Sequence, residues 1–228
     1  MPIDPLTIVF AIVAIVVVWK LNAVLGQNTG FQRSRPPETP FAKRDTTATP
    51  TSNVVRLPDG GRTAPDPARW NPFVEEGTSP ESGLDAIAAA DPSFSPGPFL
   101  DGARTAYEAI ITAFAAGERR TLENLLTRDV YDGFNAAIVD RETRRETMTT
   151  TLVSIEDAKF RAASLEGRTA RVTVRFQSKQ ISATHGPDGS VSSGSPEQVV
   201  DMNDIWTFTR DVTSRDPNWK LAATESGH

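Results

Sequence analysis

The stretch Ala170-Arg-Val-Thr-Val-Arg-Phe-Gln177 alternates apolar and polar residues with a period of two. This pattern is typical of a β-strand with one face on a core and the other in solvent. Further strand-like runs lie at 153–155, 205–210 and 219–223. A Gly- and Ser-rich run at 186–194 has the composition of a turn or hairpin loop between two of these strands. We therefore predict a meander of antiparallel strands in the C-terminal part of the chain.

Apolar residues at helical spacing come before the strands. They predict a long helix over about 99–116, which Gly117 ends, and a shorter helical face at 84–88. Two more short helices are expected to follow, with Thr121 and Thr127 as their N-caps. Helices followed by antiparallel strands indicate an α+β fold, with the helices covering one face of the sheet.

The residues upstream of these helices have a different composition. Pro, Thr, Ser and Gly dominate positions 27–79, and neither a helical nor an alternating period persists there. This composition predicts a disordered or partly polyproline-like linker at 27–79, followed by a folded domain at 80–228. The domain carries more acidic than basic residues, which argues against nucleic acid as a partner.

The N-terminus predicts a membrane anchor at 1–26. Positions 6–19 are apolar apart from Thr7, and an extended segment of 22 residues, 5–26, makes a helix roughly 33 Å long. That length crosses a hydrocarbon core of ~30 Å. A cleaved signal peptide fits less well, because the chain lacks both a basic start and a nearby small-residue cleavage site.

The charges around this segment predict its orientation. Lys and Arg are absent before the apolar run and frequent after it. The positive-inside rule therefore predicts a single-pass protein of a bacterial inner membrane, with its N-terminus outside and its C-terminal domain in the cytoplasm. The basic residues expected to contact the lipid headgroups are Lys20, Arg33, Arg35, Lys43 and Arg44.

The residue inventory disfavours most enzyme classes. The chain has no cysteine and only two histidines, which excludes disulfides and thiolate metal sites and argues against a Ser-His-Asp site. We therefore predict neither catalysis nor a cofactor or metal. The alternative is an isomerase-like pocket in which Asp204 is the base and Tyr107 or Tyr131 the polar partner. Our favoured interpretation of Asp204 is an exposed or hydrogen-bonded strand residue.

Four stretches carry a family resemblance. They are Gly83-Leu-Asp-Ala-Ile87, Phe99-Leu-Asp-Gly-Ala-Arg-Thr-Ala-Tyr-Glu-Ala-Ile110, Asp204-Ile-Trp-Thr-Phe208 and Ser214-Arg-Asp-Pro-Asn-Trp-Lys-Leu221. Over about 80–228 the chain resembles the forty-four-kilodalton subunit of the mitochondrial inner-membrane protein translocase, the import-motor anchor, and its membrane-anchored bacterial relatives. The resemblance implies a cone-like fold, similar to nuclear transport factor two, in which about three helices and a curved antiparallel sheet enclose an apolar pocket. It also implies an adaptor role, since the mitochondrial subunit tethers an Hsp70-type chaperone and contacts cardiolipin.

From the residues and the resemblance together we predict a membrane-anchored adaptor or scaffold. It would tether a cytoplasmic protein partner, such as an Hsp70-type chaperone or membrane-protein machinery, and touch membrane lipids through its anchor. The alternatives are a domain that binds a hydrophobic ligand or lipid, and an isomerase-like enzyme. The residues expected to form either plain core or a hydrophobic pocket are Tyr107, Ile110, Phe114, Phe134, Val174, Phe176, Trp206, Phe208 and Trp219.

Overall fold

The computed structural model describes residues 67–227. The expected anchor at 1–26, most of the linker and the basic residues Lys20, Arg33, Arg35, Lys43 and Arg44 lie outside the described residues. Within 67–227, no helix combines the length and the apolar character needed to cross a bilayer.

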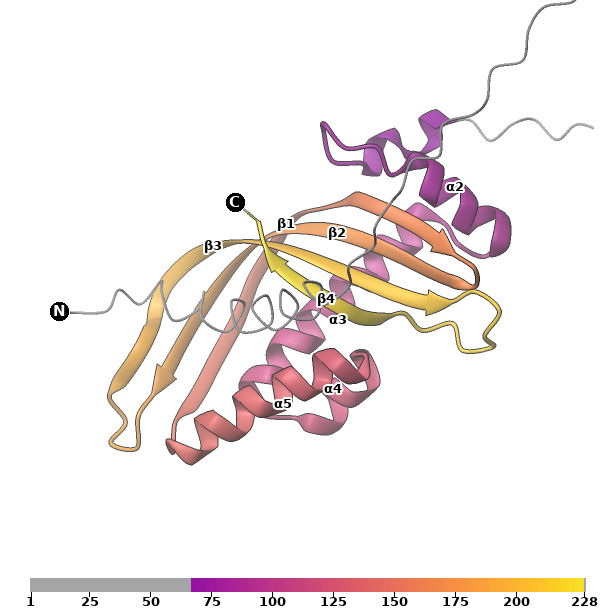
Figure 1. Ribbon diagram of the computed structural model, residues 1–228. Coiled ribbons are helices and arrows are strands. Elements are labelled where there is room, and N and C mark those ends of the chain that lie inside the picture. Colours follow the sequence, from indigo (N-terminus) through magenta and orange to yellow (C-terminus); the bar gives the residue numbers. More distant parts are fainter. Residues whose placement is uncertain (1–66, 228) are drawn as a thin grey trace, which may run out of the picture.

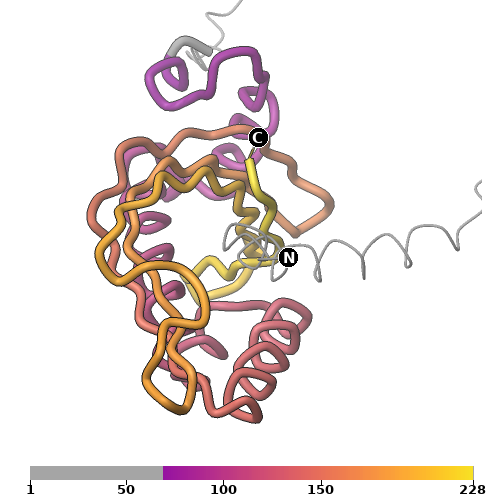
Figure 2. The backbone as a smooth tube through the Cα atoms, turned by 90° about the vertical axis from the view of Figure 1, so that its left-hand side faces the viewer, coloured from indigo at the N-terminus to yellow at the C-terminus, as the bar shows by residue number. Residues whose placement is uncertain are grey.

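The described part of the chain has four strands, which form one antiparallel meander, as predicted. The strands β1 (Thr147–Glu166), β2 (Thr169–His185), β3 (Val191–Asp211) and β4 (Lys220–Ser226) lie in the order β1-β2-β3-β4. The turn after β2 uses Gly189 at a φ of 80°, a conformation that glycine adopts without steric cost. Register shifts along β1 mark bulges, which bend a strand and increase its twist. The sheet accordingly curls around the helices (Figures 1 and 2).

Within residues 67–227, four α-helices and one 3₁₀-helix precede the sheet, one α-helix more than the resemblance implied. They are η1 (Pro67–Phe73), α2 (Glu81–Ala90), α3 (Pro96–Ala116), α4 (Arg119–Leu125) and α5 (Arg128–Thr143). Gly117 ends α3 at a φ of 72°, as predicted. Thr127 occupies the N-cap position of α5, but its side chain makes no capping hydrogen bond. Thr121 is not an N-cap, because α4 already begins at Arg119, directly after the glycine turn.

The core lies between α3 and the inward face of the sheet. The sequence pattern assigned the residues of β2 to the correct faces of the sheet, since Val172, Val174 and Phe176 are fully buried. Tyr107 stacks on Phe176, with 4.7 Å between the ring centroids. All nine candidate residues belong to this one core. Tyr107, Ile110, Val174, Phe176, Trp206 and Phe208 are buried in it, and Phe114, Phe134 and Trp219 pack against it half-buried.

The folded domain begins earlier than residue 80. Trp70 in η1 is 1% exposed, and its indole N–H donates to the Asp85 carboxylate at 2.9 Å. Its ring meets Phe160 edge-on at 6.4 Å. The backbone N–H of Glu75 donates to the carbonyl oxygen of Phe160 at 2.9 Å. The linker boundary at residue 79 is therefore wrong. The proline-rich composition around Trp70 gave no sign that this residue belongs to the core.

The outward face of β2 is not fully in solvent either. Arg175 was expected there as an exposed residue, yet its side chain is only 14% exposed. Its guanidinium pairs with Glu75 at 3.0 Å and with Asp157 at 3.1 Å. The segment between η1 and α2 thus shields part of this face, which the local alternation could not indicate.

The helix α2 approaches β1 closely at Gly83. A Cβ at Gly83 would lie 2.0 Å from the carbonyl oxygen of Ala163 on β1, whereas a Cβ at Gly102 on α3 would meet nothing within 4 Å. We expect Gly83→Ala to lower the free energy of unfolding by about 1–3 kcal/mol, because α2 must move off the sheet. Gly102→Ala should raise it by up to about 1 kcal/mol through helix propensity. Urea denaturation of both variants checks this, and equal stability would show that α2 does not approach β1 so closely.

Candidate functional site

A groove opens beside the N-terminal half of α3. It encloses about 640 Å³ between α3, the α2–α3 loop, α4 and the β3–β4 loop. This volume falls in the range of small-ligand pockets. Phe99, Phe208 and Trp219 contribute aromatic surface to it, and Asn124, Asn218 and Arg210 contribute polar groups.

The aromatic side chains of the groove support one another. The ring of Phe99 meets Trp219 edge-on at 5.0 Å and Phe208 edge-on at 6.1 Å. Phe94 packs against both Phe99 and Trp219, at 5.4 Å and 5.9 Å. Such contacts hold the rings in place. Phe94, Phe99 and Phe208 are buried, and Trp219 is half-buried.

A buried ion pair joins two walls of the groove. Arg210 on β3 donates to Asp91 at 2.5 Å, and Asp91 also accepts from the backbone N–H and hydroxyl of Ser93. Burial alone would raise the pKa of Asp91, but the Ser93 hydrogen bonds and the Arg210 charge outweigh it and lower the pKa. Arg210 further donates to the carbonyl oxygen of Asp216 at 3.2 Å in the β3–β4 loop. The pair therefore holds the α2–α3 loop on the sheet, and each charge is neutralised by the other.

A second polar cluster lies deeper, on the inward face of the sheet. The Tyr107 hydroxyl donates to Asp204 at 2.6 Å, accepts from Gln180 at 2.7 Å and lies 2.9 Å from the Ser178 hydroxyl. The structure thus joins Tyr107 and Asp204, the pair named for an isomerase-like site, and Asp204 is hydrogen-bonded as we favoured. Tyr131 is on α5 and takes no part in these hydrogen bonds.

The electrostatics of this cluster follow from burial. Burial, the charge of Asp204 and the hydrogen bond to it raise the pKa of the Tyr107 phenol far above its ordinary value. Burial also raises the pKa of Asp204, against the opposing hydrogen bond from Tyr107. The phenol thus has three hydrogen-bond partners within the fold. Within residues 67–227 no group of three or more His, Cys, Asp or Glu side chains could hold a metal ion.

The raised pKa of Asp204 makes stability depend on pH. Its folded-state pKa lies above its unfolded one, so its contribution is complete below the ordinary value of 3.8 and is lost as pH rises through the folded-state pKa. Asp204→Asn, which keeps an acceptor for Tyr107, should remove this part of the dependence and raise stability at neutral pH. Unfolding measured across acid and neutral pH checks this. Asp201→Asn is the control on the same strand, because the Asp201 carboxylate is 86% exposed. Identical pH profiles of stability for the Asp204 variant and the unmodified chain would contradict the prediction.

The groove and the polar cluster are separate. All nine candidate residues belong to the core, and of these only Phe208 and Trp219 also line the groove. Sequence reasoning missed Phe94, Asp91 and Arg210 as site residues. It also missed Ser178 and Gln180, although continuing the alternation of β2 past Phe176 would have placed both on the inward face.

Comparison with known proteins identifies this architecture. The family model of the Tim44-like domain matches residues 81–226. The chain belongs to the Tim44-like domain family. This confirms the resemblance found over about 80–228. The match begins at the first residue of α2, so η1 precedes the matched Tim44-like region even though Trp70 is part of the same core.

The Tim44-like domain also shows distant likeness to solved structures. The intermembrane space region of the chloroplast protein ARC6 is 12% identical, with a TM-score of 0.38, over 54% of this chain and 88% of that one. A conserved protein from Planctomyces limnophilus is 18% identical, with a TM-score of 0.33, over 55% of this chain and 91% of that one. A structure described as a candidate dehydratase of the NTF2-like family, from Streptomyces avermitilis, is 16% identical, with a TM-score of 0.33. The match covers 56% of this chain and 96% of that one. A search of curated proteins finds no match.

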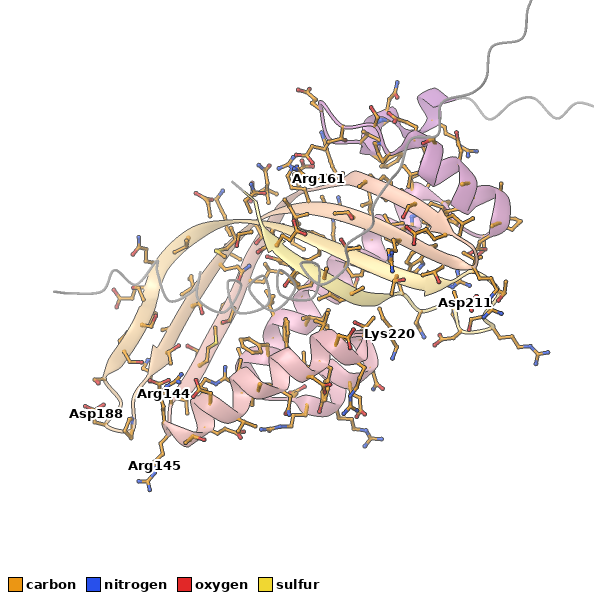
Figure 3. All side chains as sticks on the ribbon, viewed as in Figure 1. Arg144, Arg145, Arg161, Asp188, Asp211 and Lys220 are labelled. Carbon is orange, nitrogen blue, oxygen red and sulfur yellow. The ribbon has the colours of Figure 1, made fainter. Side chains whose placement is uncertain are left out.

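Figure 3 labels residues at both ends of the Tim44-like domain. Asp211 and Lys220 lie at the end with the β3–β4 loop, and Arg144, Arg145 and Asp188 lie at the opposite end (Figure 3). The groove belongs to the first end, because Arg210, Asn218 and Trp219 line it. The groove therefore lies beside the β3–β4 loop and away from the β2–β3 hairpin.

Proposed function

We propose that this chain is a single-pass adaptor of a bacterial inner membrane, which holds a protein partner close to the bilayer on its cytoplasmic side. The observation that carries this proposal is the Tim44-like domain over residues 81–226, which indicates a membrane-associated adaptor or scaffold. The apolar run at 6–19 and the basic residues after it support the anchor and its orientation. An Hsp70-type chaperone or membrane-protein machinery is the class of partner we propose.

The adaptor acts through effective concentration. A tethered domain keeps its partner within the reach of the linker, and avidity rises without any new contact. This mechanism needs a binding surface and an anchor, but no reactive group. The saturated hydrogen bonds of Tyr107 and the ion pair of Asp91 with Arg210 fit a binding role better than catalysis.

The test separates anchoring from binding. Deletion of residues 1–26 should leave a chain that still binds its partner in pull-downs but no longer sediments it with membranes. Replacement of the segment by an unrelated span of the same orientation should restore recruitment. Full complementation of a deletion strain by the anchor-less chain would refute the proposal, because nothing would then need to be held at the membrane.

The groove favours one alternative function, the binding of a hydrophobic ligand. Its volume of about 640 Å³ and its aromatic surface suit an acyl chain. Native mass spectrometry of the purified full chain should then detect a bound lipid. Ala106→Phe, which fills the groove, should remove that lipid, whereas Ala86→Phe on the exposed face of α2 should not.

A further inference from the structure

One edge of β3 is free along the first half of the strand. On that edge β4 pairs only with Asp204–Thr209, and the backbone N–H of Gly227 then donates to the carbonyl oxygen of Asn203 at 2.8 Å. Within residues 67–227 no strand pairs with this edge at positions 191–202, which form the left-hand border of the sheet in Figure 1. An unpaired edge of this kind is a template for one more strand.

The backbone groups of Asp201 point outward from this edge. Alternate residues of a strand direct their N–H and C=O groups to the same edge. Since the carbonyl oxygen of Asn203 meets Gly227 on the β4 side, the N–H and C=O of Asp201 also point to that side. A bulge at 196–199 interrupts the edge further along, where the Ser195 hydroxyl accepts from two backbone N–H groups. An added strand therefore pairs first at Asp201, in line with β4.

Exposed valines flank these backbone groups. The described part of the chain has five exposed large hydrophobic residues, and three of them, Val191, Val199 and Val200, belong to this half of β3. Val199 is 46% exposed and Val200 is 37% exposed, and both directly precede Asp201. Apolar side chains of a neighbouring strand would cover them, because cross-strand pairs of this kind stabilise a sheet.

The charge of the edge selects its occupant. The chain has 24 Lys and Arg among 228 residues, yet none of them lies in positions 180–209, which hold four acidic residues. Glu197 and Asp201 are exposed beside the valines, and Glu225 is exposed on the neighbouring β4. Lys179 contacts the Asp201 carboxylate at 3.2 Å, but that side chain is still 86% exposed. A basic strand therefore fits this edge, whereas a second copy would bring like charges together.

We propose that β3 binds a basic, extended peptide segment of a partner protein as an added strand, in line with β4 and paired at Asp201. Lys or Arg side chains of this segment lie beside Glu197 and Asp201, and its apolar side chains cover Val199 and Val200. The backbone of the edge supplies the hydrogen bonds, and the charges and valines supply the selectivity. The inference goes beyond the proposed adaptor role, because it requires neither the anchor nor the groove.

A peptide of four Lys-Val repeats is the probe, because it is basic and places apolar residues at the period of a strand. Fluorescence anisotropy measures its binding to the purified full chain in a non-ionic detergent. We expect binding that weakens with added salt, and slower amide hydrogen exchange at positions 200–203 in the complex. A peptide of four Glu-Val repeats should not bind. The Lys-Val peptide with a methyl group on every backbone amide nitrogen should not bind either, because it keeps its charge but has no backbone donor.

Charge reversal locates the binding site. Glu197→Lys combined with Asp201→Lys should weaken binding of the Lys-Val peptide roughly tenfold. The matched control is Asp101→Lys combined with Glu108→Lys, two exposed acidic residues of α3, which changes the net charge equally and should leave the affinity unchanged.

Four results would overturn the proposal. The first is no binding of the Lys-Val peptide, and the second is equal binding of its methylated form, since no strand would then be added. The third is equal weakening by the two double variants, because net charge alone would then govern binding. The fourth is a dimer of the full chain that excludes the peptide, since a second copy would then occupy the edge.

Discussion

Replacement of Trp206 by alanine is expected to lower the free energy of unfolding by about 3–5 kcal/mol, the usual cost of truncating a large buried aromatic residue. Trp206 on β3 is 5% exposed. Its ring lies 4.5 Å from Tyr107 and 5.9 Å from Phe176, so it closes the space between α3 and two strands. Loss of the indole ring would also expose the hydrogen bond between Tyr107 and Asp204 to water. Urea denaturation, monitored by far-ultraviolet circular dichroism, measures the change.

The matched control for Trp206 is an exposed residue on another strand. Val153 on β1 is 51% exposed, and Val153→Ala should change stability by less than about 0.5 kcal/mol. The sequence pattern alone would have selected Arg175 as the control, but its pairing with Glu75 and Asp157 makes that choice unsafe. Equal tolerance of the Trp206 and Val153 substitutions would mean that Trp206 faces away from the core.

Local periodicity predicted that four strands exist and which face of β2 points inward, but it found only short parts of β1 (Thr147–Glu166) and β3 (Val191–Asp211). The period of two across Ala170–Phe176 is set by strand geometry itself, and the structure buries every second residue there. The same reasoning placed Trp206 and Phe208 on one face, and they face the core together. Helix ends were predictable where one residue decides them, as Gly117 does through its left-handed backbone.

The groove could not be predicted in this way, because four separate segments form it. Its ion pair joins residues 119 positions apart, and no local period encodes such a contact. Trp70 was missed for a related reason, since its partners Asp85 and Phe160 belong to other elements. A lone aromatic residue among prolines carries no period, and only the tertiary fold makes it part of the core.

Arg141 on α5 illustrates a contact of the same long-range kind. The residue is 8% exposed, and its guanidinium donates to the carbonyl oxygens of Phe114 at 2.9 Å and Ala115 at 3.0 Å. These carbonyls belong to the last turn of α3, where a helix carries partial negative charge. Burial lowers the pKa of the Arg141 guanidinium, and within residues 67–227 no carboxylate forms a salt bridge with it. The cation is therefore held by the end of a helix, and it ties α5 to α3.

Arg141→Met should consequently lower the free energy of unfolding by about 1–3 kcal/mol. Methionine keeps much of the apolar contact with Phe114, and the Phe114 carbonyl oxygen still accepts from the backbone N–H of Gly117. The Ala115 carbonyl oxygen loses its guanidinium donor, and an unsatisfied buried group costs about 1–3 kcal/mol. Arg120→Met, on the exposed side of α4, is the control and should have little effect. If the two variants prove equally stable in chemical denaturation, water must replace the guanidinium at the end of α3. In that case packing alone, and not the buried cation, joins α5 to the long helix.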